Sequence, residues 1–210
     1  MEADDKNRAC LNRAETRRRQ VLEAAAECFR RHGFHTASMA QISKAARMSA
    51  GHIYNYFASK EEIIEAIVQQ DIAEHLALMA EVEQGEEDIL EALVAQVGSG
   101  VHRNLDRENS ALMLEVLAEA TRNPKVTAMV RQAYQTIHQR MRDLLLASRK
   151  GRQFQADGDL DDRVEILAAL FNGLMVCSVV NPAIDPQAVT RLLRQTVQQI
   201  LDPQQPPPPA

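Results

Sequence analysis

Cysteine is scarce in this chain. The 210 residues include three cysteines, Cys10, Cys28 and Cys177, an odd number without the paired spacing of zinc ligands or of a disulfide framework. We therefore expect no disulfide, no metal site and a reducing, cytoplasmic environment.

The short motifs that mark common active sites are also missing. There is no glycine-rich phosphate loop, no HExxH zinc motif and no nucleophile elbow. The acidic run DGDLDD at residues 157–162 lacks the spacing and the glutamate of a calcium-binding loop, so a solvated loop that caps a helix is the better interpretation. We expect no catalytic residue, no cofactor and no enzymatic activity.

Long apolar runs are absent too. The longest apolar stretch, residues 164–180, contains Glu165 and Asn172 and is short for a membrane span. The N-terminus is charged and has no apolar segment of the kind found in signal peptides. We expect no membrane partner.

Helical periodicity is what the sequence does have, and no strand-like alternation interrupts it. Apolar residues spaced three and four apart predict helices near residues 16–32, 60–83, 86–103, 109–121, 124–150, 161–180 and 185–202. Gly33 is expected to end the first of these helices. The polar segment between Gly151 and Gly158 is expected to be a loop. The sequence therefore predicts an all-α fold.

Charge is distributed unevenly along the chain. Residues 1–60 have a net charge of +5 and residues 61–210 a net charge of −10, although the whole chain has −5. Such asymmetry orients a protein on a polyanion, so we interpret the basic end as an electrostatic footprint for nucleic acid. For any single arginine of Arg17–Arg19 or Arg30–Arg31, a solvated helix face is the better interpretation.

The segment SMAQISKAARMSAGHIYNYFASK, residues 38–60, is the most informative part of the chain. It predicts two short helices joined by a tight turn, the second of them over residues 50–57. Ser38 and Gln41 have the spacing of a capping box, and Ser49 can cap the second helix. Two short helices with a turn also occur in many all-α proteins that do not touch DNA, so the side chains must decide.

The second of these helices has an unusual surface. Ile53 and Phe57 are four residues apart and are expected to face inward. The remaining surface is polar and aromatic, and it consists of His52, Tyr54, Asn55 and Tyr56. In a chain with only 4% aromatic residues, exposed tyrosines indicate recognition.

Residues 15–68 resemble the N-terminal domain of TetR-family transcriptional regulators. The resemblance depends on Gly33-Phe34, on the spacing Ser-x-Gly-x-Ile-Tyr-x-Tyr-Phe over 49–57, and on YxYFxSKEE over 54–62. One departure is Arg47, where the family often has glycine to end the first motif helix. Another is His52, at a position that is often Thr or Ala, which suggests an individual operator preference.

The resemblance implies an N-terminal three-helix DNA-binding domain with a helix-turn-helix, residues 15–62, and a larger C-terminal helical ligand-binding and dimerisation domain, residues 63–202. The polar, aperiodic residues 1–14 predict a flexible N-terminal arm, and residues 203–210 predict a disordered proline-rich tail.

The implied function is that of a homodimer that binds double-stranded operator DNA and responds to a small-molecule effector. Family members often control a neighbouring efflux pump or metabolic gene. Repression or activation, and one dimer or a pair of dimers on DNA, stay open. The alternative is a ligand-independent, DNA-architectural factor that uses the same motif.

The DNA-reading residues are expected on the second motif helix and beside it. Asn55 can bond bidentately to adenine, and His52 can donate to a guanine acceptor. The full set of base-reading candidates is Ala50, Gly51, His52 and Asn55, of which the first two permit close approach. The phosphate candidates are Ser38, Ser49, Tyr54, Tyr56 and Lys60. For Tyr54, packing against the first helix is an equally good interpretation.

The two last helices are expected to form the dimer interface through Leu167, Leu170, Leu174, Leu193, Val197 and Ile200. The alternative is that these residues are the core of one subunit.

An effector cavity is expected within residues 70–180, because methionine-rich apolar surfaces with a few polar groups suit varied ligands. Its candidate lining is His75, Met79, Met113, Glu115, Glu119, Tyr134, Phe171, Asn172 and Met175. Carboxylates at Glu115 and Glu119 would favour a cationic, lipophilic effector, although exposure of both to solvent is the better interpretation of their spacing.

Overall fold

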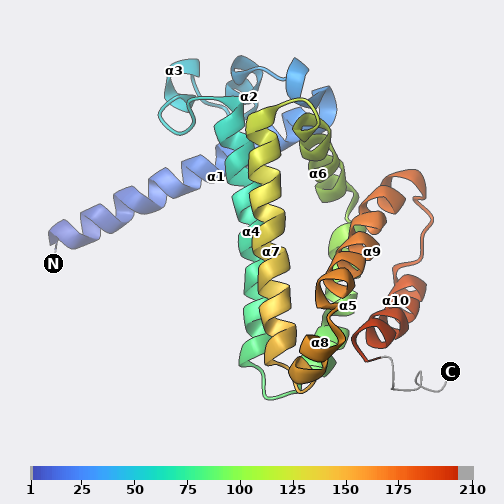
Figure 1. The fold of residues 1–210 in the computed structure, drawn as a ribbon. Helices are drawn as coiled ribbons and strands as arrows, with labels where there is room; N and C mark the ends of the chain where they lie inside the picture. Colours follow the sequence, from blue (N-terminus) through green and yellow to red (C-terminus); the bar gives the residue numbers. More distant parts are fainter. Residues whose placement is uncertain (1, 203–210) are drawn as a thin grey trace. The chain divides into compact units, whose positions relative to one another are not determined.

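The computed structural model describes residues 2–202, except for the side chains of residues 2–12, Ala50 and Asp157. Over this range it contains helices and no strand (Figure 1), which confirms the all-α fold class. The helices are α1 (Glu2–Thr36), α2 (Met39–Ala45), α3 (Ala50–Ile53), α4 (Lys60–Gln84), α5 (Ile89–Leu105), α6 (Arg107–Ala120), α7 (Pro124–Ala147), α8 (Gly151–Asp157), α9 (Leu160–Val180) and α10 (Pro186–Leu201). The expected tail, residues 203–210, lies outside the described residues.

The chain divides into two compact units. Unit 1 combines the chain up to Gln70 with Glu115–Val130, and unit 2 combines Asp71–Leu114 with the chain from Arg131 onward. Helices α4, α6 and α7 therefore each belong partly to one unit and partly to the other. The sequence suggested a division at residue 62 and gave no sign that residues 115–130 join the N-terminal unit.

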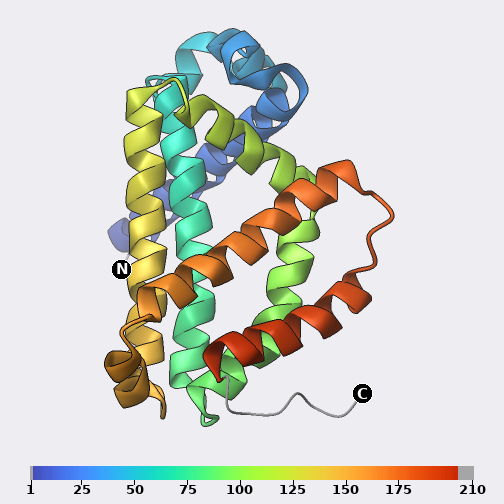
Figure 2. The ribbon, with the colours of Figure 1, turned by 45° about the vertical axis from the view of Figure 1, so that its right-hand side comes forward.

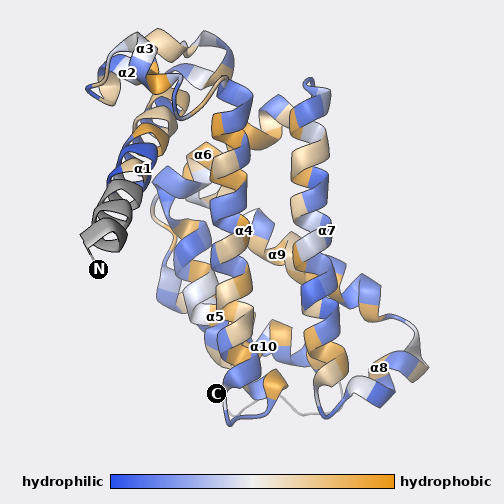
Figure 3. Cartoon of the chain, turned by 90° about the vertical axis from the view of Figure 1, so that its left-hand side faces the viewer, coloured by the Kyte–Doolittle hydropathy of each residue, from blue (hydrophilic) through white to orange (hydrophobic). Residues whose placement is uncertain are grey.

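Unit 1 is built on α1. Val21, Ala25 and Phe29 recur at helical spacing and are buried, because they form the apolar stripe of that helix. Figure 3 colours the ribbon by the hydropathy of each residue, and the coloured part of α1 turns from hydrophilic to hydrophobic residues. Gly33 interrupts the helix with φ 73° and ψ 158°, a conformation that is essentially restricted to glycine. Phe34 directly follows this break and is buried.

Helices α2 and α3 begin at the predicted caps. The Ser38 hydroxyl accepts from the N–H of Gln41, and the Gln41 side chain accepts from the N–H of Ser38, which completes the capping box. The Ser49 hydroxyl accepts from the N–H of His52. Arg47 has φ 53° in the turn, so the left-handed position that glycine often fills is occupied here by arginine.

Unit 2 packs α9 and α10 against α5, as Figure 2 shows. Its main core combines residues of α5, α9 and α10, among them Val97, Val101, Leu167 and Leu193. A second cluster joins Met79 and Val82 of α4 to Leu144 of α7. The apolar periodicity of these helices is thus satisfied within the unit.

Three local predictions differ from the structure. α1 already begins at Glu2, so the aperiodic residues before the first predicted helix are helical from residue 2 on, since Glu, Ala, Lys, Arg and Leu favour helix. The expected loop between Gly151 and Gly158 contains the short helix α8, which ends at Gly158 with φ 71°. α3 ends at Ile53, four residues before Phe57.

Candidate nucleic-acid interface

The segment formed by α3 and the turn after it, residues 50–57, exposes some side chains and buries others. Ile53 and Phe57 are 0% and 2% exposed, as expected for its inner face. His52 and Asn55 are exposed, and Tyr56 is half-buried. His52 and Asn55, two of the predicted base-reading residues, are therefore both accessible in unit 1.

The His52 ring lies between two polar neighbours. Its Nδ1 is 3.5 Å from Asn55 Nδ2, and its Nε2 is 3.4 Å from the Tyr56 hydroxyl. The His52 and Tyr56 rings meet edge to face with centroids 5.3 Å apart. If Nδ1 accepts from the Asn55 amide, the proton of a neutral imidazole lies on Nε2. These contacts are long, so base edges in the major groove can replace them at little cost.

The small residues at the start of α3 leave room for a partner. A Cβ on Gly51 would meet no atom within 4 Å, and Gly51 is exposed. The side chain of Ala50 lies outside the described part of the structure. Tyr54 is 54% exposed, so the interpretation that it packs against the first helix is not supported.

Two of the phosphate candidates are the caps themselves. Ser38 and Ser49 are exposed, and each hydroxyl accepts one backbone N–H at 3.2 Å. A serine hydroxyl retains a donor while it accepts, although that of Ser38 already faces Gln41 Oε1 at 3.0 Å. At Ser49 the hydroxyl proton is therefore the better placed of the two for a phosphate oxygen.

Lys60 requires a correction. Its Nζ donates to the carbonyl oxygens of Phe34 at 2.5 Å and Ala37 at 2.7 Å, and it lies 3.4 Å from that of His35. The ammonium group also lies 4.4 Å from the centre of the Phe34 ring. All three donors thus satisfy carbonyls that the end of α1 leaves without helical partners. In this structure Lys60 holds the connection between α1 and α2 instead of presenting its charge to phosphate.

Two long-range contacts position the motif, and the sequence did not indicate them. Gln20 of α1 donates from Nε2 to the carbonyl of Ala46, at the end of α2, over 2.7 Å. The Arg18 guanidinium lies 4.7 Å from the centre of the Phe57 ring. No local spacing pattern links these residues, so only the packed structure reveals them.

Glu115 and Glu119, both expected in the effector cavity or in solvent, lie in unit 1. Glu115 Oε1 accepts from the backbone N–H of Phe34 at 2.6 Å. Glu119 is 1% exposed, and its Oε2 contacts Arg122 Nε at 2.9 Å and His35 Nε2 at 3.1 Å. Burial disfavours its charged form, but hydrogen bonds from Asn123 and Arg122 and the proximity of His35 lower the pKa of Glu119 overall. Because protein groups occupy both carboxylates, the argument for a cationic effector fails.

The other cavity candidates belong to unit 2 but do not form one group. Met79 and Met175 are buried in its interior, and Asn172 is exposed. Met113 is half-buried. The Phe171 ring lies over Gly100, where a Cβ would come within 2.7 Å of it. The residues predicted together are therefore divided between core and surface.

Tyr134 is partly exposed and donates a hydrogen bond to Glu165. Burial and this bond raise the pKa of Tyr134 to about 12. Its hydroxyl is thus engaged with a carboxylate of α9.

His75 belongs to a polar cluster with Asp71 and Arg103. Arg103 donates to Asp71 Oδ1 at 2.9 Å and lies 2.6 Å from His75 Nδ1, which is itself 2.8 Å from the Asp71 carbonyl. Burial opposes the charge of Asp71, yet the hydrogen bonds from His75 and Arg103 lower its pKa. These side chains satisfy one another within unit 2.

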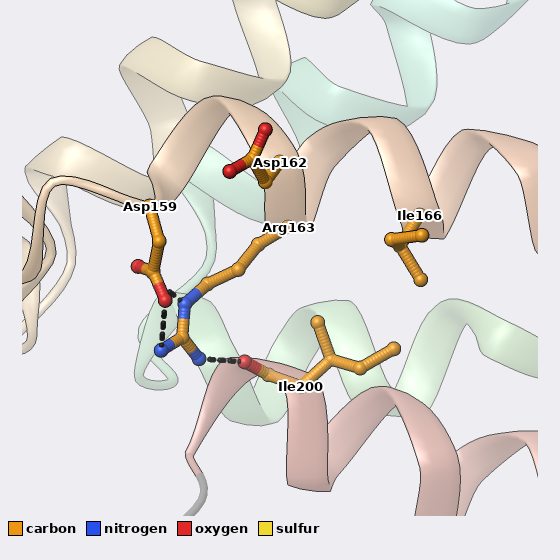
Figure 4. A pocket seen from close by; sticks show the side chains of 5 residues that line it. All are labelled: Asp159, Asp162, Arg163, Ile166 and Ile200. Atoms are coloured by element: carbon orange, nitrogen blue, oxygen red, sulfur yellow. Dashed lines mark hydrogen bonds and ion pairs between the residues drawn. The ribbon is translucent and has the colours of Figure 1, made fainter.

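A hollow of about 230 Å³ lies in unit 2 beside the ends of α9 and α10. Asp159, Asp162, Arg163, Ile166 and Ile200 line it (Figure 4). Arg163 donates to Asp159 and to the Ile200 carbonyl, so its guanidinium is already satisfied. None of the predicted cavity residues lines this hollow.

The residues chosen for the dimer interface also require correction. Leu167, Leu174, Leu193 and Val197 are buried in the core of unit 2, and Leu170 and Ile200 pack against that core. The exposed apolar side chains on the same two helices are Ile166, Val176, Val179, Val180 and Leu192. The apolar periodicity predicted the positions of α9 and α10 along the chain. It did not predict which face of each helix is buried within the subunit.

The described residues contain no group of three or more His, Cys, Asp or Glu side chains arranged to hold a metal ion.

Among the described helices, α9 is long and apolar enough to cross a membrane. The core helices of soluble proteins can have the same length and composition.

Comparison with known proteins gives the family. Residues 21–67 match the bacterial regulatory proteins of the tetR family, and residues 87–202 match the C-terminal domain of BetI-type transcriptional repressors. The regulator UidR of Escherichia coli K12 is 39% identical over 142 residues, which cover 66% of this chain and 69% of UidR.

Solved structures agree with this. Salmonella enterica GusR is 30% identical, with a TM-score of 0.70 over 89% of this chain and 95% of GusR. FadR of Bacillus subtilis, solved with stearoyl-CoA, shares the fold at 14% identity, with a TM-score of 0.69 over 87% of this chain and 97% of FadR. The chain therefore belongs to the TetR family, whose members are DNA-binding transcriptional regulators and not enzymes.

Proposed function

We propose that this protein is a homodimeric transcriptional repressor that binds a palindromic operator through α3 and leaves it when a small molecule binds unit 2. The observation that supports the proposal most directly is the exposed pair of His52, in the capped short helix α3, and Asn55, in the turn that follows it. Asn55 would bond adenine through both the oxygen and the nitrogen of its amide, and His52 would donate to guanine. Tyr54, Tyr56 and the Ser49 hydroxyl would contact phosphates beside them.

The dimer is supported by the apolar face of α9. Ile166, Val176 and Val180 are between 48% and 70% exposed and share that face. Leu192 of α10 is 60% exposed. A second copy of the chain would cover these side chains by a two-fold interface, in which the same surface is used twice. Two reading helices then meet two half-sites about one turn of DNA apart, which gives the specificity that a single motif lacks.

The response to an effector would pass through α6. This helix starts in unit 2 at Arg107, and its last turns in unit 1 include Glu115 and Glu119, which hold Phe34 and His35 at the end of α1. An effector that favours one placement of α6 would change how α1 is held, and by linkage DNA would weaken effector binding by the same factor. FadR of Bacillus subtilis, which has the same fold and was solved with stearoyl-CoA, supports the proposal of an effector.

The proposal is tested by fluorescence anisotropy with DNA from upstream of the protein's own gene and a scrambled duplex. We expect tight, salt-dependent binding to the first duplex and loss of that preference in Asn55→Ala. Equal, weak binding to both duplexes would instead support a DNA-architectural role. Increased transcription on addition of the protein to a reporter assay would identify an activator.

A further inference from the structure

Helix α1 has a row of arginines beside the reading motif. Arg13 and Arg17 are four residues apart and Gln20 follows three residues later, so the three side chains share one face of the helix. Both arginines are exposed, and Gln20 is half-buried. Val21 and Ala25 of the same helix point into the core of unit 1. The row thus borders the packed face of α1 without being part of it.

Gln20 fixes this row to the helix-turn-helix. Its Nε2 donates to the Ala46 carbonyl at 2.7 Å, and its Oε1 accepts from Arg17 Nη1 at 2.9 Å. Ala46 directly precedes Arg47, an exposed residue in the turn between α2 and α3. The row of Arg13 and Arg17 therefore starts beside that turn and is held in register with it.

No carboxylate among the described side chains pairs with the row. Among the contacts of the described residues, neither Arg13 nor Arg17 forms an ion pair, whereas Arg30 and Arg31, further along the same helix, both pair with Glu27. Exposed guanidinium groups without carboxylate partners are suited to a polyanion that supplies the missing charge.

The length of the row matches a short run of phosphates. At about 1.5 Å per residue, Arg13 and Arg17 lie about 6 Å apart along the helix axis. Phosphates of one DNA strand follow each other about every 3.4 Å along the duplex axis, so the two arginines span about two nucleotides. We infer that Arg13 and Arg17 form a second DNA contact, which binds successive backbone phosphates next to the α2–α3 turn. This inference rests on the proposed function, because it requires a duplex seated on α3.

Arg19 offers a matched control on the same helix. It is exposed like Arg17 and only two residues away, but at 3.6 residues per turn it points to the other side of α1. Removing the charge of Arg19 changes the net charge of the protein as much as removing that of Arg17. A contact that depends on position will distinguish the two, and general attraction will not.

The test compares Arg13→Gln/Arg17→Gln, Arg19→Gln and Arg13→Lys/Arg17→Lys with the wild type. Anisotropy titrations at several salt concentrations use the operator duplex and a scrambled duplex. Each lost phosphate contact lowers the slope of log affinity against log salt by about 0.9, so the double glutamine variant of a dimer should lose about 2 to 4. It should weaken binding to both duplexes by the same factor, because phosphates carry no sequence information. The lysine variant should keep the wild-type slope.

Arg13→Gln alone leaves the bond between Arg17 and Gln20 intact, so a smaller loss of slope in this variant separates phosphate binding from damage to the motif. An unchanged slope in the double glutamine variant overturns the inference, and so does a loss in Arg19→Gln equal to that in the single variant Arg13→Gln. A wild type that binds both duplexes equally contradicts the proposed function instead. The variants' slopes would then still show whether the row binds phosphate.

Discussion

Glu115 Oε1 accepts a hydrogen bond from the backbone N–H of Phe34 over 2.6 Å, although the two residues are 81 positions apart in the chain. The amide needs a partner because Gly33 interrupts α1 immediately before it and Phe34 is buried. This one bond attaches the break in α1 to α6, the helix that continues into unit 2.

Gly33→Ala should destabilise the protein more than Gly158→Ala. Both glycines have positive φ, 73° and 71°. At Gly33 a Cβ would also lie 3.2 Å from Glu115 Oε1, whereas at Gly158 it would meet nothing within 4 Å. We expect a loss of about 1–3 kcal/mol at Gly33, where ψ places the residue in a region reserved for glycine, and about 1–2 kcal/mol at Gly158. Urea unfolding measures both values. Equal costs would show that the contact with Glu115 adds no constraint.

Glu119→Gln should lower stability in a way that depends on pH. Because the pKa of Glu119 is lowered in the folded state, its carboxylate contributes stability above the ordinary pKa near 4.5, and this contribution is lost as pH falls through the lower, folded value. The variant should therefore be less stable than the wild type by about 1–3 kcal/mol at pH 7, and the difference should shrink below pH 4.5. Urea midpoints from pH 7 to pH 3 test this, with the exposed Glu23→Gln as control. A difference that stays constant with pH would contradict the charged role.

His52→Ala and Asn55→Ala should each weaken operator binding by about 1–3 kcal/mol. Both side chains are exposed, so the fold should be unaffected. Binding to a scrambled duplex should change little, since base contacts contribute mainly to specific binding. If the ratio of operator to scrambled affinity is unchanged in both variants, α3 does not read bases through these residues.

Ile166→Glu/Val176→Glu should convert the proposed dimer into monomers. The substitutions place two carboxylates on the exposed apolar face of α9, and the proposed two-fold axis would double them across the interface. Sedimentation velocity measures the oligomeric state, and Ala128→Glu, at an exposed position of α7, is the control. A variant that remains dimeric would place the interface elsewhere.

The sequence predicted what depends on neighbours along the chain. The capping box of Ser38 and Gln41 and the N-cap at Ser49 are both in the structure. Each of them links residues no more than a few positions apart, so their spacing contains the required information. Most helices of the C-terminal region were also located correctly, since apolar periodicity is local.

Only the tertiary structure decided which partners distant side chains find. It directed the ammonium of Lys60 to carbonyls at the end of α1, buried Glu119 beside Arg122, and bonded Gln20 to Ala46. It also selected which apolar face of α9 is covered by α5, which left Ile166 and Val176 exposed. A helical pattern fixes the angle at which a side chain leaves its own helix. What it meets there depends on how helices far apart in the sequence pack, because a buried polar group takes the nearest available partner in space.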